Sequence, residues 1–244
     1  MAHLYRAAAR LPKLQPRDSY PPEERDDWDF MNARINIGFG PTAEMVDGLP
    51  YGVPHFTALT LSPPLAAALS RLGRAQMLRQ GKPGTFSQSD HELIDLVLCF
   101  DSDYWCFMAG HTPGAVAGGV RIEAIEALRD RREDLLTDDE RQVVEFIRAV
   151  RDRTMTDESY FAMAERLGSE RGAMELVYFV CSLVFHHLFC WSMGVPEMER
   201  PALDQMLQEF RNGTREIPSR YNGDDPRYAA FGDSHITVGQ NSAS

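Results

Sequence analysis

Cysteine is scarce in this sequence, and its scarcity excludes one class of protein. Only four of the 244 residues are cysteine (Cys99, Cys106, Cys181 and Cys190), and no two of them form a CxxC pair. Four cysteines are too few for a small domain held together by disulfides, and free cysteine in an apolar stretch behaves as a small hydrophobic residue. The sequence therefore predicts a reduced, cytoplasmic protein.

Positive charge and long apolar runs are also in short supply. Lys and Arg number 25 against 36 Asp and Glu, which gives a formal net charge of −11. Contacts to nucleic-acid phosphates and polybasic membrane anchors both need clustered Lys and Arg. The longest apolar run, residues 176–185, is too short to cross a bilayer, and the first residues lack the apolar segment of a secretory signal. We therefore expect neither nucleic acid nor a membrane as a partner.

Three regions differ in composition. Residues 1–54 are rich in Pro and Gly and have poor periodicity, so they predict an irregular N-terminal arm that packs on the body or on a partner subunit. Residues 55–210 carry apolar side chains at helical spacing and predict a helical domain. Residues 211–244 are rich in Gly, Pro, Asn, Asp and Ser, which favours an extended C-terminal tail. No segment alternates convincingly like a strand, so the predicted fold class is all-α.

Capping signals place the expected helices. Helix starts are predicted at Pro63, Ser87, Thr137, Thr156 or Asp157, and Ser169. The first of these helices would bury Leu65, Leu69 and Leu72. Asp101 and Asp103 can cap a helix that begins at Tyr104, and Pro113 predicts a kink or a break in it. The last helix, residues 174–193, is apolar nearly all round and should be central or buried in a subunit interface.

The stretch from Glu92 to Gly119 carries the most specific pattern, because no GxGxxG, Walker or nucleophile-elbow motif occurs. Glu92 begins one expected helix, His111 follows 19 residues later on the next, and the small residues Ala115 and Gly119 come after it. This arrangement resembles the carboxymuconolactone decarboxylase and alkylhydroperoxidase D superfamily. The resemblance covers residues 55–198 and implies a helical bundle of the alkylhydroperoxidase D type that forms a dimer, trimer or hexamer.

One departure from that superfamily decides between its chemistries. Its peroxidase branch uses a C-x-x-C-x-x-x-H motif, and the two cysteine positions are occupied here by Tyr104 and Phe107. The nearest thiol, Cys106, lies one residue too early, and a peroxide-reducing dithiol needs two cysteines that can bridge. The carboxylate of Glu92 and the imidazole of His111 remain as an acid/base pair.

The residues therefore predict a cofactor-independent enzyme of the lyase, decarboxylase or isomerase type. Its substrate would be a small organic acid or an aromatic-derived metabolite. Tyr104 could donate a proton or bind an oxyanion, and Trp105 and Phe107 would line the pocket. His186 and His187 would contact the substrate, since polar groups in an apolar helix need partners. No metal site is predicted, because two adjacent helical histidines point about 100° apart and cannot easily bind one ion.

Two other functions stay open at this point. The protein could be a thiol peroxidase or reductase that uses Cys106, or a non-catalytic ligand-binding or assembly protein with the same fold. Each site residue also has a structural interpretation. Glu92 could complement the dipole of its helix, His111 could bond a carbonyl freed by Pro113, and Cys106 could be an ordinary core residue.

Overall fold

The computed structural model describes residues 15–39, 45–46, 49–50, 58–59 and 61–218. Within these residues the chain is mostly helical, which confirms the all-α prediction. The α-helices are α1 (Arg25–Phe39), α3 (Pro63–Met77), α4 (Gln88–Ser102), α5 (Met108–Gly118), α6 (Ile122–Arg129), α7 (Asp138–Asp152), α8 (Asp157–Leu167), α9 (Glu170–Met193) and α10 (Arg200–Arg211). Short 3-10 turns cover Arg17–Ser19, Pro22–Glu24 and Glu133–Leu135.

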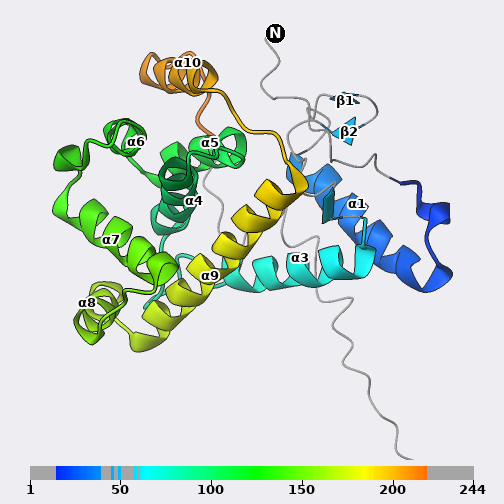
Figure 1. The fold of residues 1–244 in the computed structure, drawn as a ribbon, viewed down its shortest axis with the longest axis horizontal. Coiled ribbons are helices and arrows are strands. Elements are labelled where there is room, and N and C mark those ends of the chain that lie inside the picture. The colour runs from blue at the N-terminus through cyan, green and yellow to red at the C-terminus, as the bar shows by residue number, and fades with distance from the viewer. Residues whose placement is uncertain (1–14, 40–44, 47–48, 51–57, 60, 219–244) are drawn as a thin grey trace, which may run out of the picture.

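Helix α4 lies at the centre of the bundle. It packs against α5, α6, α7 and α9, and every residue from Gln88 to Phe100 except Ser89 is buried. The long helix α9 crosses the molecule and contacts α4, α7 and α8 (Figure 1). The main hydrophobic core lies among these helices, so polar side chains on the buried faces of α4 are held rigidly.

The helix starts predicted at Pro63, Ser87, Thr137, Asp157 and Ser169 are confirmed to within one residue. Ser87 and Thr137 form capping boxes with Asp90 and Glu140, and Thr156 caps α8 through the backbone of Ser159. Each capping oxygen accepts from an N–H of the first turn that has no partner within the helix. Ser169 does the same for α9. Gly194 ends that helix in the left-handed conformation (φ 67°), as its position after the apolar run predicted.

The segment between α4 and α5 differs from the prediction. Helix α5 begins at Met108 and not at Tyr104, because Asp103 ends α4 with a left-handed backbone (φ 55°). Asp101 does not cap α5 either, since its carboxylate binds arginine side chains from two other segments. These are Arg131, Arg148 and Arg151. Helix α5 continues to Gly118 through Pro113, so the proline does not break it.

The predicted irregular arm contains regular structure. Residues 25–39 form α1, which packs against α3, and Met45–Val46 pairs antiparallel with Leu49–Pro50, Met45 opposite Pro50. A second small apolar cluster of Met31, Leu59, Ala66 and Ala67 joins the two helices. The buried face of α3 therefore differs from the predicted leucine stripe, and Leu65 is exposed. The first 14 residues of the arm, and residues 219–244 of the predicted tail, lie outside the described residues.

Helix α9 exposes part of its apolar surface. Its exposed large apolar side chains are Met174, Tyr178, Phe185, Leu188 and Trp191. Among the described residues it is the one helix long and apolar enough to cross a membrane by length and composition, and 33% of that window is buried inside the protein. A core helix of a soluble protein can meet the same criteria. The contacts of α9 with α4, α7 and α8 account for its buried part.

Candidate active site at the α4–α5 junction

The pair predicted from the sequence is brought together by α4 and α5. Ser87 fixes the start of α4, which places Glu92 in its second turn, and α5 packs along α4 and presents His111. The Nδ1 atom of His111 lies 2.9 Å from Oε2 of Glu92, which is hydrogen-bonding distance. Glu92 is fully buried, whereas 28% of the His111 side chain is exposed. Glu92 therefore holds the inner edge of the imidazole and leaves the rest of the ring accessible.

A second carboxylate, Asp95, completes the cluster, and sequence reasoning missed it. Its Oδ2 atom lies 2.8 Å from the same Nδ1 atom of His111. The hydrogen bond of Nδ1 is directed at Glu92, so the contact with Asp95 is ionic, and neither Asp95 oxygen has a hydrogen-bond partner within the described residues. The sequence did contain a signal for Asp95. It lies three residues after Glu92, on the same helix face, and it interrupts an otherwise apolar run.

The two carboxylates set the charge of His111. Burial alone would lower the pKa of His111, but the nearby charges of Asp95 and Glu92 outweigh it and raise that pKa well above its usual value of 6.5. Burial likewise opposes ionisation of Asp95, and the charge and proximity of His111 nevertheless lower the pKa of that carboxyl. The cluster is thus an imidazolium held between buried carboxylates at neutral pH.

His91 closes the cluster on its inner side. Its Nδ1 atom lies 2.7 Å from Oε1 of Gln80, and because an amide oxygen can only accept, Nδ1 carries the proton. Its Nε2 atom lies 3.6 Å from Oδ2 of Asp95. Burial lowers the pKa of His91, which therefore stays neutral beside the charged His111.

Four donor groups around this point are close enough to surround a divalent cation. The ligand atoms of His91, Glu92, Asp95 and His111 all lie within 4.8 Å of one another. The Nδ1–H of His111 already occupies the space between the carboxylates, at 2.8 and 2.9 Å from their oxygens. Binding of a cation at this position would require His111 to lose the proton on Nδ1.

Only one of the three predicted pocket aromatics borders His111. The ring of Phe107 lies 5.7 Å from the His111 ring, centroid to centroid. Trp105 is instead buried against Phe100, and its backbone N–H donates to Glu197. The Tyr104 hydroxyl donates to the carbonyl oxygen of Val195 at 2.5 Å, and burial raises its pKa. Tyr104 is therefore not poised to transfer a proton to a substrate at His111, contrary to its predicted role.

The remaining predicted site residues gather at a second place, near the other end of α4. Cys106 lies beside Cys99 and His187, and the Nε2 atom of His187 is 3.0 Å from the carbonyl oxygen of Tyr104. Burial raises the pKa of the Cys106 thiol, so it is not an activated nucleophile. His186 does not join this place: its ring lies 5.7 Å from that of Phe185, and its charge acts on Asp95 of the acid/base cluster.

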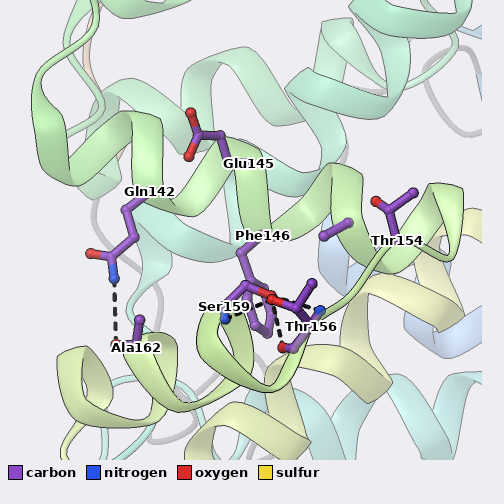
Figure 2. A pocket seen from close by; sticks show the side chains of 8 residues that line it. Gln142, Glu145, Phe146, Thr154, Thr156, Ser159 and Ala162 are labelled. Carbon is purple, nitrogen blue, oxygen red and sulfur yellow. Dashed lines mark hydrogen bonds between the residues drawn. The ribbon is translucent and has the colours of Figure 1, made fainter.

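A separate depression lies between α7 and α8 (Figure 2). Its volume is about 290 Å³, and none of the predicted site residues lines it. The residues that line it are Gln142, Glu145, Phe146, Ala149, Thr154, Thr156, Ser159 and Ala162. Glu145 is the one charged side chain in the lining of the depression, and the lining holds no histidine or cysteine. The chemistry of the α4–α5 junction therefore has no counterpart there.

Comparison with known proteins identifies no relative for this chain. No family model, no curated protein and no solved structure matches it.

Proposed function

We propose that this protein is an acid/base enzyme in which His111 exchanges protons with a small-molecule substrate. The observation that carries the proposal is the asymmetry of the cluster. His111 is partly exposed, while the carboxylates that hold its Nδ1 are buried, at 0% and 1% side-chain exposure. The substrate would therefore meet the imidazole, and Glu92 and Asp95 would orient the ring and stabilise its charge, as carboxylates do for catalytic histidines.

The chemistry that suits this arrangement is proton transfer next to a carbonyl group. An imidazolium can protonate the carbanion or enolate that forms in decarboxylation, in double-bond or lactone isomerisation, and in dehydration. The spacing of Glu92, His111, Ala115 and Gly119, which resembles that of the carboxymuconolactone decarboxylase superfamily, supports the same reaction class. Phe107 beside His111 favours a flat or apolar substrate. We propose no organic cofactor for this chemistry.

The structure brings the Sγ atoms of Cys99 and Cys106 within 4.8 Å of one another, but it does not present Cys106 as an activated peroxidase thiol. Its pKa is raised by burial and by the neighbouring thiols of Cys190 and Cys99, whereas attack on peroxide needs a thiolate. A homo-oligomer remains part of the proposal, because α9 exposes a row of large apolar side chains that a second copy could cover.

Exchange of carbon-bound protons in deuterated water tests the proposal even while the reaction product is unidentified. A panel of 3-oxo acids, unsaturated lactones and enol-forming ketones is incubated with the protein, and loss of α-proton signals is followed by NMR. We expect at least one compound to exchange faster with the wild type, and His111→Gln to remove at least about tenfold of that acceleration.

The matched control is Glu145→Gln, which removes an exposed carboxylate of the α7–α8 depression and should leave the rate unchanged. Circular dichroism establishes that each variant is folded at the assay temperature. Undiminished exchange in folded His111→Gln would overturn the proposal.

A further inference from the structure

Three of the four cysteines in this chain gather at one point that the proposed function does not use. Cys99 lies in the last turns of α4, Cys106 in the turn before α5, and Cys190 on α9. The thiol of Cys106 interacts with those of both Cys99 and Cys190. The fourth cysteine, Cys181, is exposed on α9. Segments that are far apart in the sequence therefore bring soft donor atoms together inside the protein.

A histidine joins these thiols. The Sγ atoms of Cys99 and Cys106 and a ring nitrogen of His187 all lie within 4.8 Å of one another. Donor atoms in a tetrahedral zinc site are separated by about 3.5–3.8 Å, as follows from Zn–S and Zn–N bonds of about 2.3 and 2.0 Å. Cys190 follows His187 by one helical turn, on the same side of α9, and lies next to Cys106. Cys190 lies outside the group of three but interacts with Cys106, which makes it our candidate for the fourth donor.

The orientation of His187 agrees with a ligand role. Its Nε2 atom lies 3.0 Å from the carbonyl oxygen of Tyr104, which can only accept, so Nε2 carries a proton and the neutral ring has its lone pair on Nδ1. A hydrogen bond of this kind, from the ring nitrogen that does not bind the metal to a backbone carbonyl, is what fixes most metal-binding histidines.

We propose that Cys99, Cys106 and His187 bind a zinc ion, with Cys190 as the fourth ligand. Binding releases the protons of the three thiols to solvent and involves no change of oxidation state. A Cys₃His set is a structural zinc type, because all four positions are filled by protein. The ion would connect the end of α4, the turn before α5 and α9, and so stabilise the segment from which His111 projects.

The ligands of this site are not members of the acid/base cluster, although the charge of Asp95 acts on His187. The ring of Phe107 contacts both His111 and His187, at 5.7 and 5.8 Å, and no ligand of the zinc site belongs to the other cluster. Loss of zinc binding and loss of proton exchange can therefore be separated experimentally.

Zinc content per chain tests the inference. The full-length protein is purified without chelator, reconstituted with Zn²⁺, freed of excess ion and analysed by plasma mass spectrometry. We expect about one zinc per chain in the wild type, and a fall of at least about tenfold at equal free zinc in Cys99→Ser and in His187→Gln. Cys181→Ser is the matched control, because it removes the exposed cysteine, and Asp95→Asn controls for the other cluster. Both controls should retain the ion.

Cobalt binding provides a second, spectroscopic readout that does not depend on how much of each variant is purified. Addition of Co²⁺ to folded, metal-free wild type should give an intense near-ultraviolet thiolate-to-metal band, which Zn²⁺ then abolishes. Cys106→Ser, at a less buried position, should weaken this band while circular dichroism stays unchanged. Wild type that takes up neither ion, a Cys99–Cys106 disulfide in place of the metal, or equal zinc in Cys99→Ser and Cys181→Ser would each overturn the inference.

Discussion

His111→Gln tests the electrostatics of the α4–α5 cluster most directly. Glutamine can still donate a hydrogen bond to Glu92, but it cannot carry a charge, so the variant buries two carboxylates without a cation. Removal of one partner from a buried ion pair costs about 3–5 kcal/mol. The contacts of 2.8 and 2.9 Å and the full burial of Glu92 and Asp95 put this cluster in that class. For a domain of this size, such a loss lowers the Tm by roughly 6–20 °C.

The dependence of that loss on pH follows from the direction of each pKa shift. His111 has a raised folded pKa, so its contribution to the free energy of unfolding is fully present below its unfolded pKa of about 6.5 and is lost as the pH rises through the folded value. Asp95 has a lowered folded pKa, so its contribution is present above about 3.8 and is lost as the pH falls through the folded value. His91 faces the same cluster but is neutral.

Urea unfolding of wild type and His111→Gln, followed by circular dichroism between pH 4 and pH 10, measures this difference. We expect the difference in the free energy of unfolding between the two proteins to be largest at pH values above the folded pKa of Asp95 and below that of His111. Above the raised pKa of His111 the difference should shrink. Addition of Glu92→Gln to His111→Gln should restore part of the stability, because it removes a buried charge that no longer has a counterion. A difference below about 1 kcal/mol, as for an exposed ion pair, or one that does not change with pH, would refute the buried imidazolium.

Four further substitutions test the scaffold and the exposed face of α9. Asp101→Asn should lower the free energy of unfolding by about 1.5–3 kcal/mol in urea, since its carboxylate accepts charged hydrogen bonds from three arginines; an unchanged midpoint would contradict this. Gly172→Ala should cost about 1–3 kcal/mol by thermal unfolding, because its Cβ would lie 2.4 Å from the Gly84 carbonyl oxygen. Gly73→Ala, where a Cβ meets nothing within 4 Å, should be neutral or stabilising. Phe185→Glu should shift light-scattering mass toward the monomer, and a wild type that is already monomeric would exclude the interface.

Local signals in the sequence were sufficient for the framework of the bundle. A capping box is a short-range interaction, so Ser87 and Thr137 could be placed from the residues within one turn of each helix start. The left-handed end of α4 at Asp103 was not predicted, because Asp is favoured both in that conformation and at the start of a helix, and the sequence was interpreted as the second. Helix α1 was not predicted either, because its burial depends on contact with α3 and not on its own weak periodicity.

The candidate site likewise has one part that sequence signals predict and one part that they do not. Glu92 and His111 were expected to act as a pair because their spacing resembles that of a known superfamily, and the two side chains meet at 2.9 Å. The thiol cluster depends on α9 passing the end of α4, which places His187 beside Cys99 across more than 80 residues of sequence. No local pattern encodes that contact, and the sequence predicted His187 as a substrate-contacting residue rather than as a neighbour of Cys99.

The arrangement of the acid/base cluster also constrains the order of proton transfers. Two carboxylates near one Nδ1 atom raise the pKa of His111, so at neutral pH the ring enters the proposed reaction as an acid and becomes a base only after it has given up its proton.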